Sequence, residues 1–383
     1  MHNLTPLIVA GLLTGMSVTT VHAGDVKISG ILDTGLNIQQ VKNGEKPSGT
    51  IVSLDSGQDA GSRVNIRAHE VLPSGTKVGI HLGTAIASDT GSYYFGKLFG
   101  GNSTLFVQNE SWGELHMGRS GSLISPYGDT GVIGQLTDNF AWGMGSAGNW
   151  RLNNGRYDNM ITIRSPSFNG LKIYAQRTFS ETGSEPNKGG REEHDTHTSV
   201  AAVYTNNTFD LIAAYDRDQF TNTPTARYGH EMQVVSLAGN YRVADMQLGL
   251  FTQFFKDAYR APGAASLKEL LKDGTTDGRG FDGWLAGLEW MASVPGGKAY
   301  AVAIYNQGKY KGEFSANPEQ EREFKRYTFG LGYEYVLSRR TCLYAGSVYT
   351  HGSGLLASSN FRGDIAEDDI NRIQYQFGVL HRW

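Results

Sequence analysis

Few residues of this sequence have the types and spacing that chemistry requires, and none of these groups is complete. Residues 143–148 read Gly-Met-Gly-Ser-Ala-Gly, which matches the glycine spacing of a dinucleotide-binding loop. Such a loop follows a strand and opens a helix, but DNFAW precedes this segment and NWRLNNG follows it. We therefore interpret 143–148 as part of a glycine-rich connector.

Histidines beside carboxylates are the other candidates, because imidazole and carboxylate groups bind zinc and transfer protons. The His-Glu pairs at 69–70 and 230–231 lack the second histidine of a zinc-protease helix. His194, Asp195 and His197 have the types needed for a metal site. Because Glu192 and Glu193 adjoin them, a solvated run of charges is the favoured interpretation.

Nucleophilic and phosphate-binding motifs are missing from the sequence. It has no G-x-S-x-G elbow and no P-loop. The single cysteine, Cys342, excludes an intramolecular disulfide and a multi-cysteine metal cluster, and we interpret it as a small packed residue. The sequence therefore predicts no catalytic residue, no metal ion and no cofactor.

The composition favours a β-rich chain that lacks membrane-spanning helices. Hydrophobic residues make up 39% of the 383 residues, the mean hydropathy is -0.35, and no run of 18 uncharged apolar residues occurs. Glycine is abundant at 50 residues, while proline is scarce at 10, so the chain is neither collagenous nor a proline-rich disordered segment. The formal net charge of -3 gives no basic footprint for nucleic acid.

The N-terminus has the features of a secretory signal peptide. Residues 7–13 (LIVAGLL) form a short apolar core, and residues 21–23 (VHA) resemble a small-x-small cleavage pattern. A buried first strand is the alternative. We expect residues 1–23 to be removed, so that the mature, exported chain begins at Gly24.

Most of the remaining sequence alternates with a period of two, which is typical of strands with two different faces. In residues 26–35 (VKISGILDTG), Val26, Ile28 and Leu32 share one face, and polar side chains share the other. Similar alternation occurs in 63–71, 77–83, 328–335 and 374–383.

The connectors between these segments alternate between short and long. Short turns are typified by 72–75, 109–112, 205–208 and 337–340. Long connectors rich in glycine and charge run at 41–60, 89–101, 120–154, 180–195, 219–229, 258–280, 310–324 and 352–369. This pattern predicts an all-β fold, a transmembrane 16-stranded antiparallel β-barrel with long extracellular loops and short periplasmic turns.

A closed barrel explains the pattern better than a soluble β-sandwich. In a bilayer every backbone polar group must be paired within the protein, so a spanning sheet has to close on itself. A sandwich would also alternate, but it would not need connectors of such different length at its two ends. We expect residues 24–383 to form one barrel domain.

Several blocks of the sequence resemble the general porins of Gram-negative bacteria, especially the neisserial and β-proteobacterial type. They are VKISGILDTGL (26–36), SRVNIRAHEVLPSGTKVGIHL (62–82), SWGELHMGRS (111–120), RYDNMITIRSPSFNGLKIYAQ (156–176), YEYVLSRRTCLYAGSVYTH (333–351) and FGVLHRW (377–383). The resemblance covers nearly all of the mature chain. Asn65 stands where such porins commonly have glycine, and Trp383 ends the chain where phenylalanine is more usual.

The resemblance implies a water-filled channel in the outer membrane of a Gram-negative bacterium. Small hydrophilic solutes and inorganic ions would diffuse through it passively, without catalysis. Its partners would be outer-membrane lipid and lipopolysaccharide, two further copies of the chain in a homotrimer, and no nucleic acid. The third loop, 120–154, would fold into the lumen, which its glycine-rich and weakly charged composition suits, and Trp383 would serve as the assembly signal.

Strand parity predicts which residues line the pore and its constriction. If Val26, Ile28, Val64, Ile66, Val78 and Ile80 face lipid, the charged residues between them face the lumen, with His69, His81 and His116 nearby. The predicted pore-lining residues are Lys27, Asp33, Arg63, Arg67 and Lys77 on the wall and Asp129 and Asp138 on the third loop. A basic wall that faces an acidic loop predicts a preference for anions. The alternative is that these basic groups pair with inward carboxylates, which would give little selectivity.

Two other functions remain open from the sequence. An outer-membrane barrel enzyme, such as a phospholipase or protease, would have fewer strands, and fewer than about fourteen would favour that class. A secreted, soluble β-rich adhesin would need no detergent.

Overall fold

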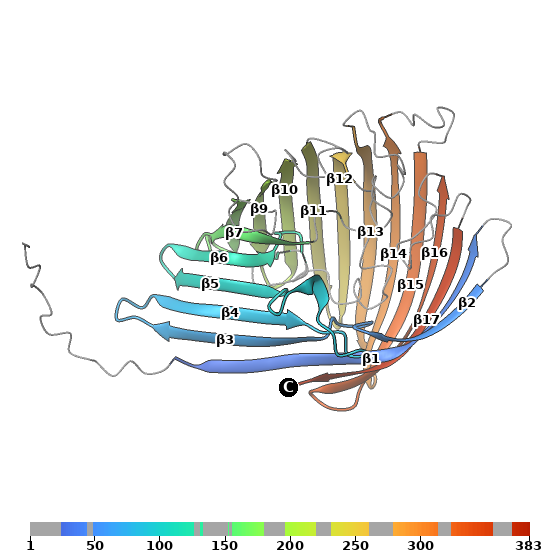
Figure 1. The fold of residues 1–383 in the computed structure, drawn as a ribbon, viewed down its shortest axis with the longest axis horizontal. Helices are drawn as coiled ribbons and strands as arrows, with labels where there is room; N and C mark the ends of the chain where they lie inside the picture. Colours follow the sequence, from blue (N-terminus) through green and yellow to red (C-terminus); the bar gives the residue numbers. More distant parts are fainter. Residues whose placement is uncertain are drawn as a thin grey trace, which may run out of the picture.

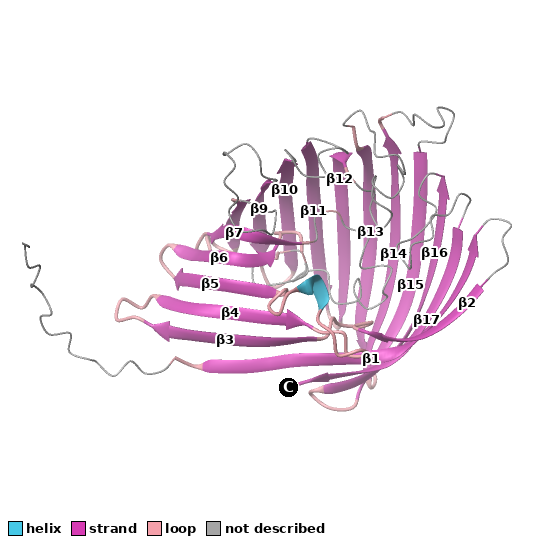
Figure 2. Cartoon of the chain, viewed as in Figure 1, coloured by secondary structure: helices cyan, strands magenta, loops and turns pink. Residues whose placement is uncertain are grey.

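The computed structural model describes residues 24–43, 49–125, 131–132, 152, 155–179, 196–219, 231–259, 279–312, 323–354 and 370–383. Almost all of this is strand, as Figure 2 shows, with one short 3-10 turn, η1, at Tyr94–Gly96. None of the helical residues described forms a segment long and apolar enough to cross a membrane. The predicted signal peptide, residues 1–23, lies outside the described residues and stays a prediction.

Seventeen strand segments follow one another along the described chain. Their bounds are β1 Val26–Asn43, β2 Gly49–Ser56, β3 Arg63–Val71, β4 Lys77–Ala85, β5 Asn102–Asn109, β6 Gly113–Gly121, β7 Arg156–Arg164, β8 Leu171–Thr178, β9 Thr196–Thr205, β10 Phe209–Gln219, β11 Glu231–Val243, β12 Met246–Ala258, β13 Phe281–Val294, β14 Gly297–Tyr310, β15 Glu323–Val336, β16 Thr341–Gly354 and β17 Ile370–Arg382.

The strands form one closed antiparallel sheet. From β3 onwards each strand pairs with the next, and β17 returns to pair with β1. Strands β2 and β3 both pair with β1, β2 along residues 34–41 and β3 along residues 26–31, so together they fill one place in the wall. The sheet is therefore a barrel of sixteen strands, which confirms the predicted fold class. In Figure 1, β3–β6 run across the view while β10–β15 run nearly upright, as expected when tilted strands of opposite walls cross.

The prediction that residues 41–60 form one long connector is wrong in part. Residues 49–56 continue the sheet because Ile51, Val52 and Leu54 are residues that favour strands, and Val52 and Leu54 share one face. The pairing then stops at 57–62, where the chain turns into the barrel and Gln58, Ala60 and Ser62 become buried. This interruption separates β2 from β3.

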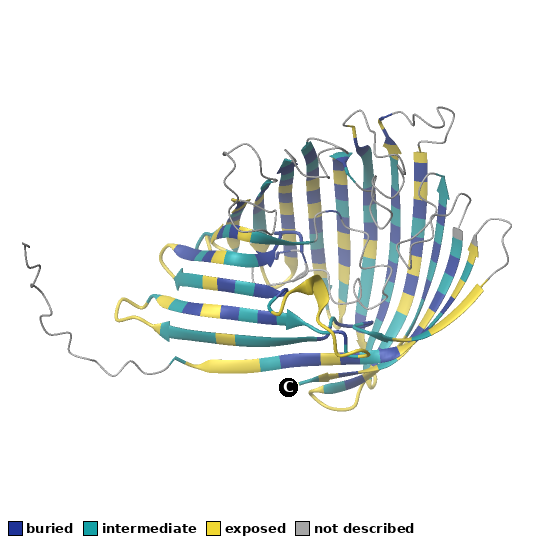
Figure 3. Ribbon diagram, in the orientation of Figure 1, coloured by how far each residue is buried: buried dark blue, intermediate teal, exposed yellow. Residues whose placement is uncertain are grey.

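Burial alternates along the strands, as Figure 3 shows for β10–β15. The outward face is apolar: Val26, Ile28, Leu250, Leu288 and Leu331 are each more than half exposed in the isolated chain. The inward face carries most of the buried polar side chains, such as Asn37, Gln374 and Gln376. Apolar side chains outside and polar ones inside are typical of a transmembrane barrel.

The two ends of the described chain lie on the side of the barrel that carries the short turns. Trp383 and Gly30 exchange two backbone hydrogen bonds, with N···O distances of 3.2 and 3.3 Å. Gly24 lies against the carbonyl group of His69, close to the 72–75 turn. An even number of barrel strands brings the chain back to the side where it began.

Candidate pore-lining site

Strands β1, β3 and β4 gather basic side chains on the inward face. Lys27 lies directly across from Arg67, and Arg67 lies across from His81. Directly paired residues point to the same side of a sheet, so these three side chains are neighbours. His81 is buried and its Nε2 lies 3.0 Å from Oδ1 of Asn65, whereas Lys27 and Arg67 are exposed. We call Lys27, Arg63, Arg67 and His81 the basic wall.

The other predicted basic residues lie on the same face. Arg63 is across from Ile31 and half-buried, and its Nη1 donates to the carbonyl oxygen of Gly61 at 2.7 Å. Lys77, across from Val71, is exposed beside the 72–75 turn, so it belongs to the rim of the barrel.

The prediction that Asp33 lines the pore has to be corrected. The Asp33 side chain points inward but is fully buried beneath the 57–62 segment. Oδ2 accepts hydrogen bonds from the backbone N–H groups of Asp59 and Ala60, at 2.7 and 2.6 Å. Oδ1 accepts one from the Tyr344 hydroxyl group at 2.6 Å. Asp33 therefore anchors the interruption between β2 and β3 and does not line the open pore, because its oxygens are occupied by these donors.

Two further buried carboxylates, Glu114 and Asp210, are engaged in ion pairs. Glu114 forms an ion pair with Arg164 and lies 3.1 Å from Nε2 of His116. Asp210 forms an ion pair with Arg242. The negative charges of Glu114 and Asp210 are therefore each balanced by a neighbouring arginine.

Described residues of the 120–154 connector lie against the inner side of the barrel. Leu123, Ile124 and Val132 are at most 2% exposed, and they form one cluster with inward side chains of strands across the barrel. Those side chains are Tyr174, Ala201, Ile212, Ala214, Ala238, Phe251, Leu285, Tyr300, Val302, Ile304 and Val348. This inner surface, which we call the apolar shelf, spans β8–β16. Burial against it favours an inward course for these parts of the connector, at about 1.5–3 kcal/mol for each large side chain.

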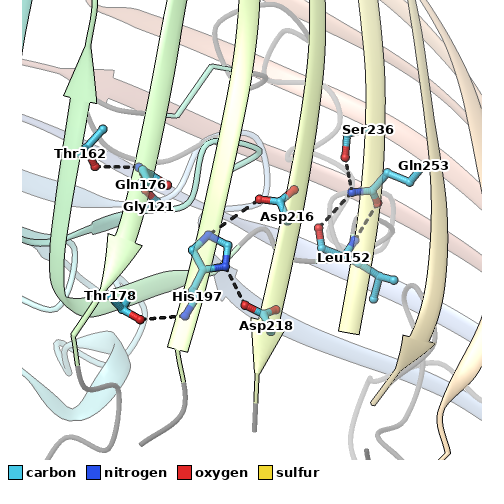
Figure 4. Close-up of polar contacts among 10 residues, drawn as sticks. All are labelled: Gly121, Leu152, Thr162, Gln176, Thr178, His197, Asp216, Asp218, Ser236 and Gln253. Carbon is cyan, nitrogen blue, oxygen red and sulfur yellow. Dashed lines mark hydrogen bonds and ion pairs between the residues drawn. The ribbon is translucent and has the colours of Figure 1, made fainter. Parts of the chain in front are cut away.

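Two wall glutamines hold the backbone of the same connector, as Figure 4 shows. Gln253 accepts from the Leu152 N–H group at 2.9 Å and donates to the Leu152 carbonyl oxygen at 3.2 Å, so one amide satisfies both backbone groups. Gln253 also donates to Ser236. Gln176 donates to the carbonyl oxygen of Gly121 at 3.1 Å. Of the predicted loop residues, Asp129 and Asp138 lie outside the described residues, as does the 143–148 segment.

The interpretation of His197 as part of a solvated run of charges is also wrong. His197 lies at the start of β9, faces inward and is 1% exposed. Its Nδ1 is 2.7 Å from Oδ1 of Asp218, and its ring stacks on that of Tyr157 with centroids 4.1 Å apart. The period of two explains the location: Asp216 and Asp218 on β10 alternate with outward residues, so both face inward beside His197. His194 and Asp195 lie outside the described residues.

Gln176 and Gln253 are not among the residues predicted from the sequence to line the pore, although the sequence contains a signal for them. Gln176 and Gln253 each occupy an inward position of an alternating strand, where a long amide can reach a buried backbone group. Nothing in the alternation says which connector such an amide binds. Cys342 faces inward and packs with Ile31, Ala60, Tyr344 and Leu380, in agreement with its interpretation as a packed residue.

Comparison with known proteins identifies related chains. A family model described as Gram-negative porin matches residues 9–355. An outer membrane porin protein of Bordetella pertussis is 28% identical over 98% of this chain and 99% of its own length.

Solved structures share the fold over nearly the whole chain. The anion-selective porin from Comamonas acidovorans has a TM-score of 0.66 at 19% identity, covering 94% of this chain and 100% of that one. The trimer form of the outer membrane protein OmpT of Vibrio cholerae has a TM-score of 0.59 at 15% identity, with the same coverage. At these identities the likeness supports the fold.

Proposed function

Because the chain belongs to the Gram-negative porin family and is an outer-membrane channel for passive diffusion of small hydrophilic solutes, we propose that this channel prefers anions. The observation that carries the proposal is the pairing across β1, β3 and β4, which puts Lys27, Arg67 and His81 side by side on the inner face. Clusters of lysine and arginine in a pore lower the energy of a passing anion. The anion-selective porin that shares this fold is consistent with the proposal.

Removing charge from the basic wall tests this preference. Replacing Arg63→Ser and Arg67→Ser together should shift the reversal potential in a salt gradient towards cations, because two positive charges leave the inner face. The shift should be larger at low salt. At 0.1 M salt, charges are already screened over about 10 Å, so the arginines affect a passing ion less as the salt concentration rises. Planar-bilayer recordings in a KCl gradient measure it.

Arg177→Ser is the matched control for that pair. Arg177 lies on β8 and pairs with Thr198 on the outward face, so its loss removes positive charge from the other side of the wall. Its reversal potential should equal that of the unmodified channel. The proposal is overturned if the unmodified channel already prefers cations.

A narrowed lumen is the second element of the proposal. We infer that the 120–154 connector folds into the channel as a whole, supported by the burial of Leu123, Ile124 and Leu152 and by the two glutamine contacts. With Asp129 and Asp138 on it, the connector would oppose the basic wall and create a field across the constriction. Asp33, being buried, takes no part in that field.

A homotrimer is the assembly we propose. The Vibrio cholerae relative in fold is described in a trimer form. In this chain the connector between β4 and β5 carries three apolar side chains that are each more than half exposed: Tyr93, Phe95 and Leu98. Figure 1 shows this connector next to the short strands β4 and β5. Exposed apolar groups on a connector favour burial against another subunit. Unboiled samples in gel electrophoresis should show a trimer band that heating converts to monomer, and a monomer in mild detergent would contradict the proposal.

The remaining assignments stay predictions with a structural basis. Trp383 directly follows β17 and is hydrogen-bonded to Gly30 of β1. The predicted assembly signal therefore lies where the C-terminal strand closes the barrel. The outward apolar residues would contact outer-membrane lipid, and lipopolysaccharide in its outer leaflet. That the channel catalyses no reaction also stays a prediction.

A further inference from the structure

We propose that a row of basic side chains on the outer face of β8–β12 binds the phosphate groups of lipopolysaccharide. The inference deepens the proposed contact with lipopolysaccharide and rests on it. The row consists of Arg177 on β8, Arg217 on β10 and Lys256 on β12, with Thr198 on β9 and Gln233 on β11 between them. We call these five residues the outer basic row.

The strand register puts the outer basic row at one level of the barrel. Arg177 lies directly across from Thr198, and Thr198 lies directly across from Arg217. Arg217 lies across from Gln233, which lies across from Lys256. Directly paired residues point to the same side of a sheet, and neighbouring strands lie about 4.8 Å apart. The backbone positions of successive positive groups are therefore about 10 Å apart along one line.

The outer basic row faces away from the lumen. Asp216 and Asp218, which flank Arg217 on β10, are at most 4% exposed and point inward. Because successive side chains of a strand alternate, Arg217 points outward. Nη1 of Arg177 donates to Oγ1 of Thr198 at 2.8 Å on this exposed side of the sheet. The row therefore takes no part in the passage of ions.

The level of the row is the boundary between the membrane and the long connectors. Each member lies within two residues of a strand end that adjoins a connector predicted to be long and extracellular. One step towards the middle of the strands, the outward side chains are apolar and 37–52% exposed: Val200, Tyr215, Val235 and Phe254. The outer leaflet of the outer membrane consists of lipopolysaccharide. The apolar residues therefore lie at the level of its acyl chains, and the row lies at the level of its phosphorylated sugars.

The charge of the row suits phosphate groups. Its five positions hold three cations and no carboxylate. Glu231 forms an ion pair with Arg217, whose side chain nevertheless stays 43% exposed. A guanidinium group can give two parallel hydrogen bonds to one phosphate group, and the long stem of Lys256 lets its ammonium group reach the head-group level. Thr198 and Gln233 add a hydroxyl and an amide donor between the charges.

The row stays accessible to lipid in the proposed trimer. The subunit contact that we propose lies at the connector between β4 and β5, whereas the row begins at β8 and ends at β12. Figure 1 shows β9–β12 side by side in one wall. The lipid A part of lipopolysaccharide carries phosphate groups at both ends of a sugar pair, while phosphatidylglycerol has a single phosphate group. Lipopolysaccharide can therefore contact two positive groups of the row at once, which strengthens binding.

Binding of purified lipopolysaccharide to the detergent-solubilised full barrel, measured by calorimetry in the presence of EDTA, tests the proposal. Arg217→Gln and Lys256→Gln together should weaken binding about 25-fold, since each positive charge near an anionic lipid surface contributes about fivefold. Arg339→Gln and Arg340→Gln together are the matched control. They remove two exposed positive charges from the 337–340 turn at the opposite rim, and this variant should bind like the unmodified protein.

Removing the carboxylate beside the row should have the opposite effect. Glu231→Gln releases the guanidinium group of Arg217 from its ion pair and should tighten binding about two- to fivefold. Weaker binding by this variant would overturn the proposal, because Glu231 and not the row would then contact the lipid.

A further measurement needs no variant and so does not depend on how the variants fold. Lipopolysaccharide from which the phosphate groups have been removed should bind the unmodified barrel about 25-fold more weakly than the intact lipid does. Equal binding of the two lipids would overturn the proposal, and so would equal affinity for phosphatidylglycerol.

The outcomes separate this inference from the proposed contact on which it rests. If the unmodified barrel and the Arg217→Gln, Lys256→Gln variant bind lipopolysaccharide equally, the contact exists but the outer basic row is not its site. If the unmodified barrel binds no lipopolysaccharide, both the contact and the site are wrong.

Discussion

Replacing Asp33 with alanine is expected to lower the free energy of unfolding of the barrel by about 4 kcal/mol. The change removes the acceptor for the N–H groups of Asp59 and Ala60 and for the Tyr344 hydroxyl group, and leaves these three donors buried. Hydrogen bonds to charged groups contribute about 1.5–3 kcal/mol each, and the cavity allows partial relaxation. Urea unfolding in lipid vesicles, followed by tryptophan fluorescence, measures the loss.

Two further variants show whether the loss comes from this network. Tyr344→Phe removes one donor and should cost about 2 kcal/mol. Asp55→Ala is the matched control, because Asp55 is a half-buried carboxylate of the same region that accepts from the side chains of Asn37 and Ser53. It should cost about 1 kcal/mol. If Asp33→Ala unfolds like Asp55→Ala, Asp33 is not an anchor.

Breaking the contact between Gln253 and Leu152 is expected to raise the single-channel conductance and its open-channel noise. Gln253→Leu removes two hydrogen bonds to the Leu152 backbone and one to Ser236. At about 1 kcal/mol each, the two bonds to Leu152 hold the connector by roughly 2 kcal/mol, which is about thirtyfold in the ratio of held to released forms. Planar-bilayer recordings at fixed salt compare the variant with the unmodified channel.

The matched control replaces another buried, inward-facing glutamine on a different part of the wall. Gln376 faces inward on β17 across from Asn37, and Gln376→Leu should leave the open-channel noise unchanged because it does not touch Leu152. Deleting residues 128–140 should raise conductance more than Gln253→Leu does. Unchanged conductance in both the deletion and Gln253→Leu would mean that the 120–154 connector does not narrow the pore.

The sequence by itself determined the class of fold and the face on which each strand residue lies. A period of two is a local property, because neighbouring side chains of a strand point to opposite sides whatever the strand pairs with. The alternation of Val26, Ile28 and Leu32 with polar residues therefore sufficed to separate the outward from the inward face. The alternation of short and long connectors sufficed for a barrel, since each pair of strands crosses the membrane and returns.

Only the tertiary structure decided which inward residues meet. Closure of the barrel brings Tyr344 to Asp33, 311 residues away in sequence, and turns a predicted pore-lining carboxylate into a buried anchor. The inward course of the connector brings Leu152 to Gln253, 101 residues away. The register between β9 and β10 puts His197 between Asp216 and Asp218. These contacts depend on strand register and on how a connector packs. Neither property leaves a local sequence pattern, because both are set by contacts between segments far apart in the chain.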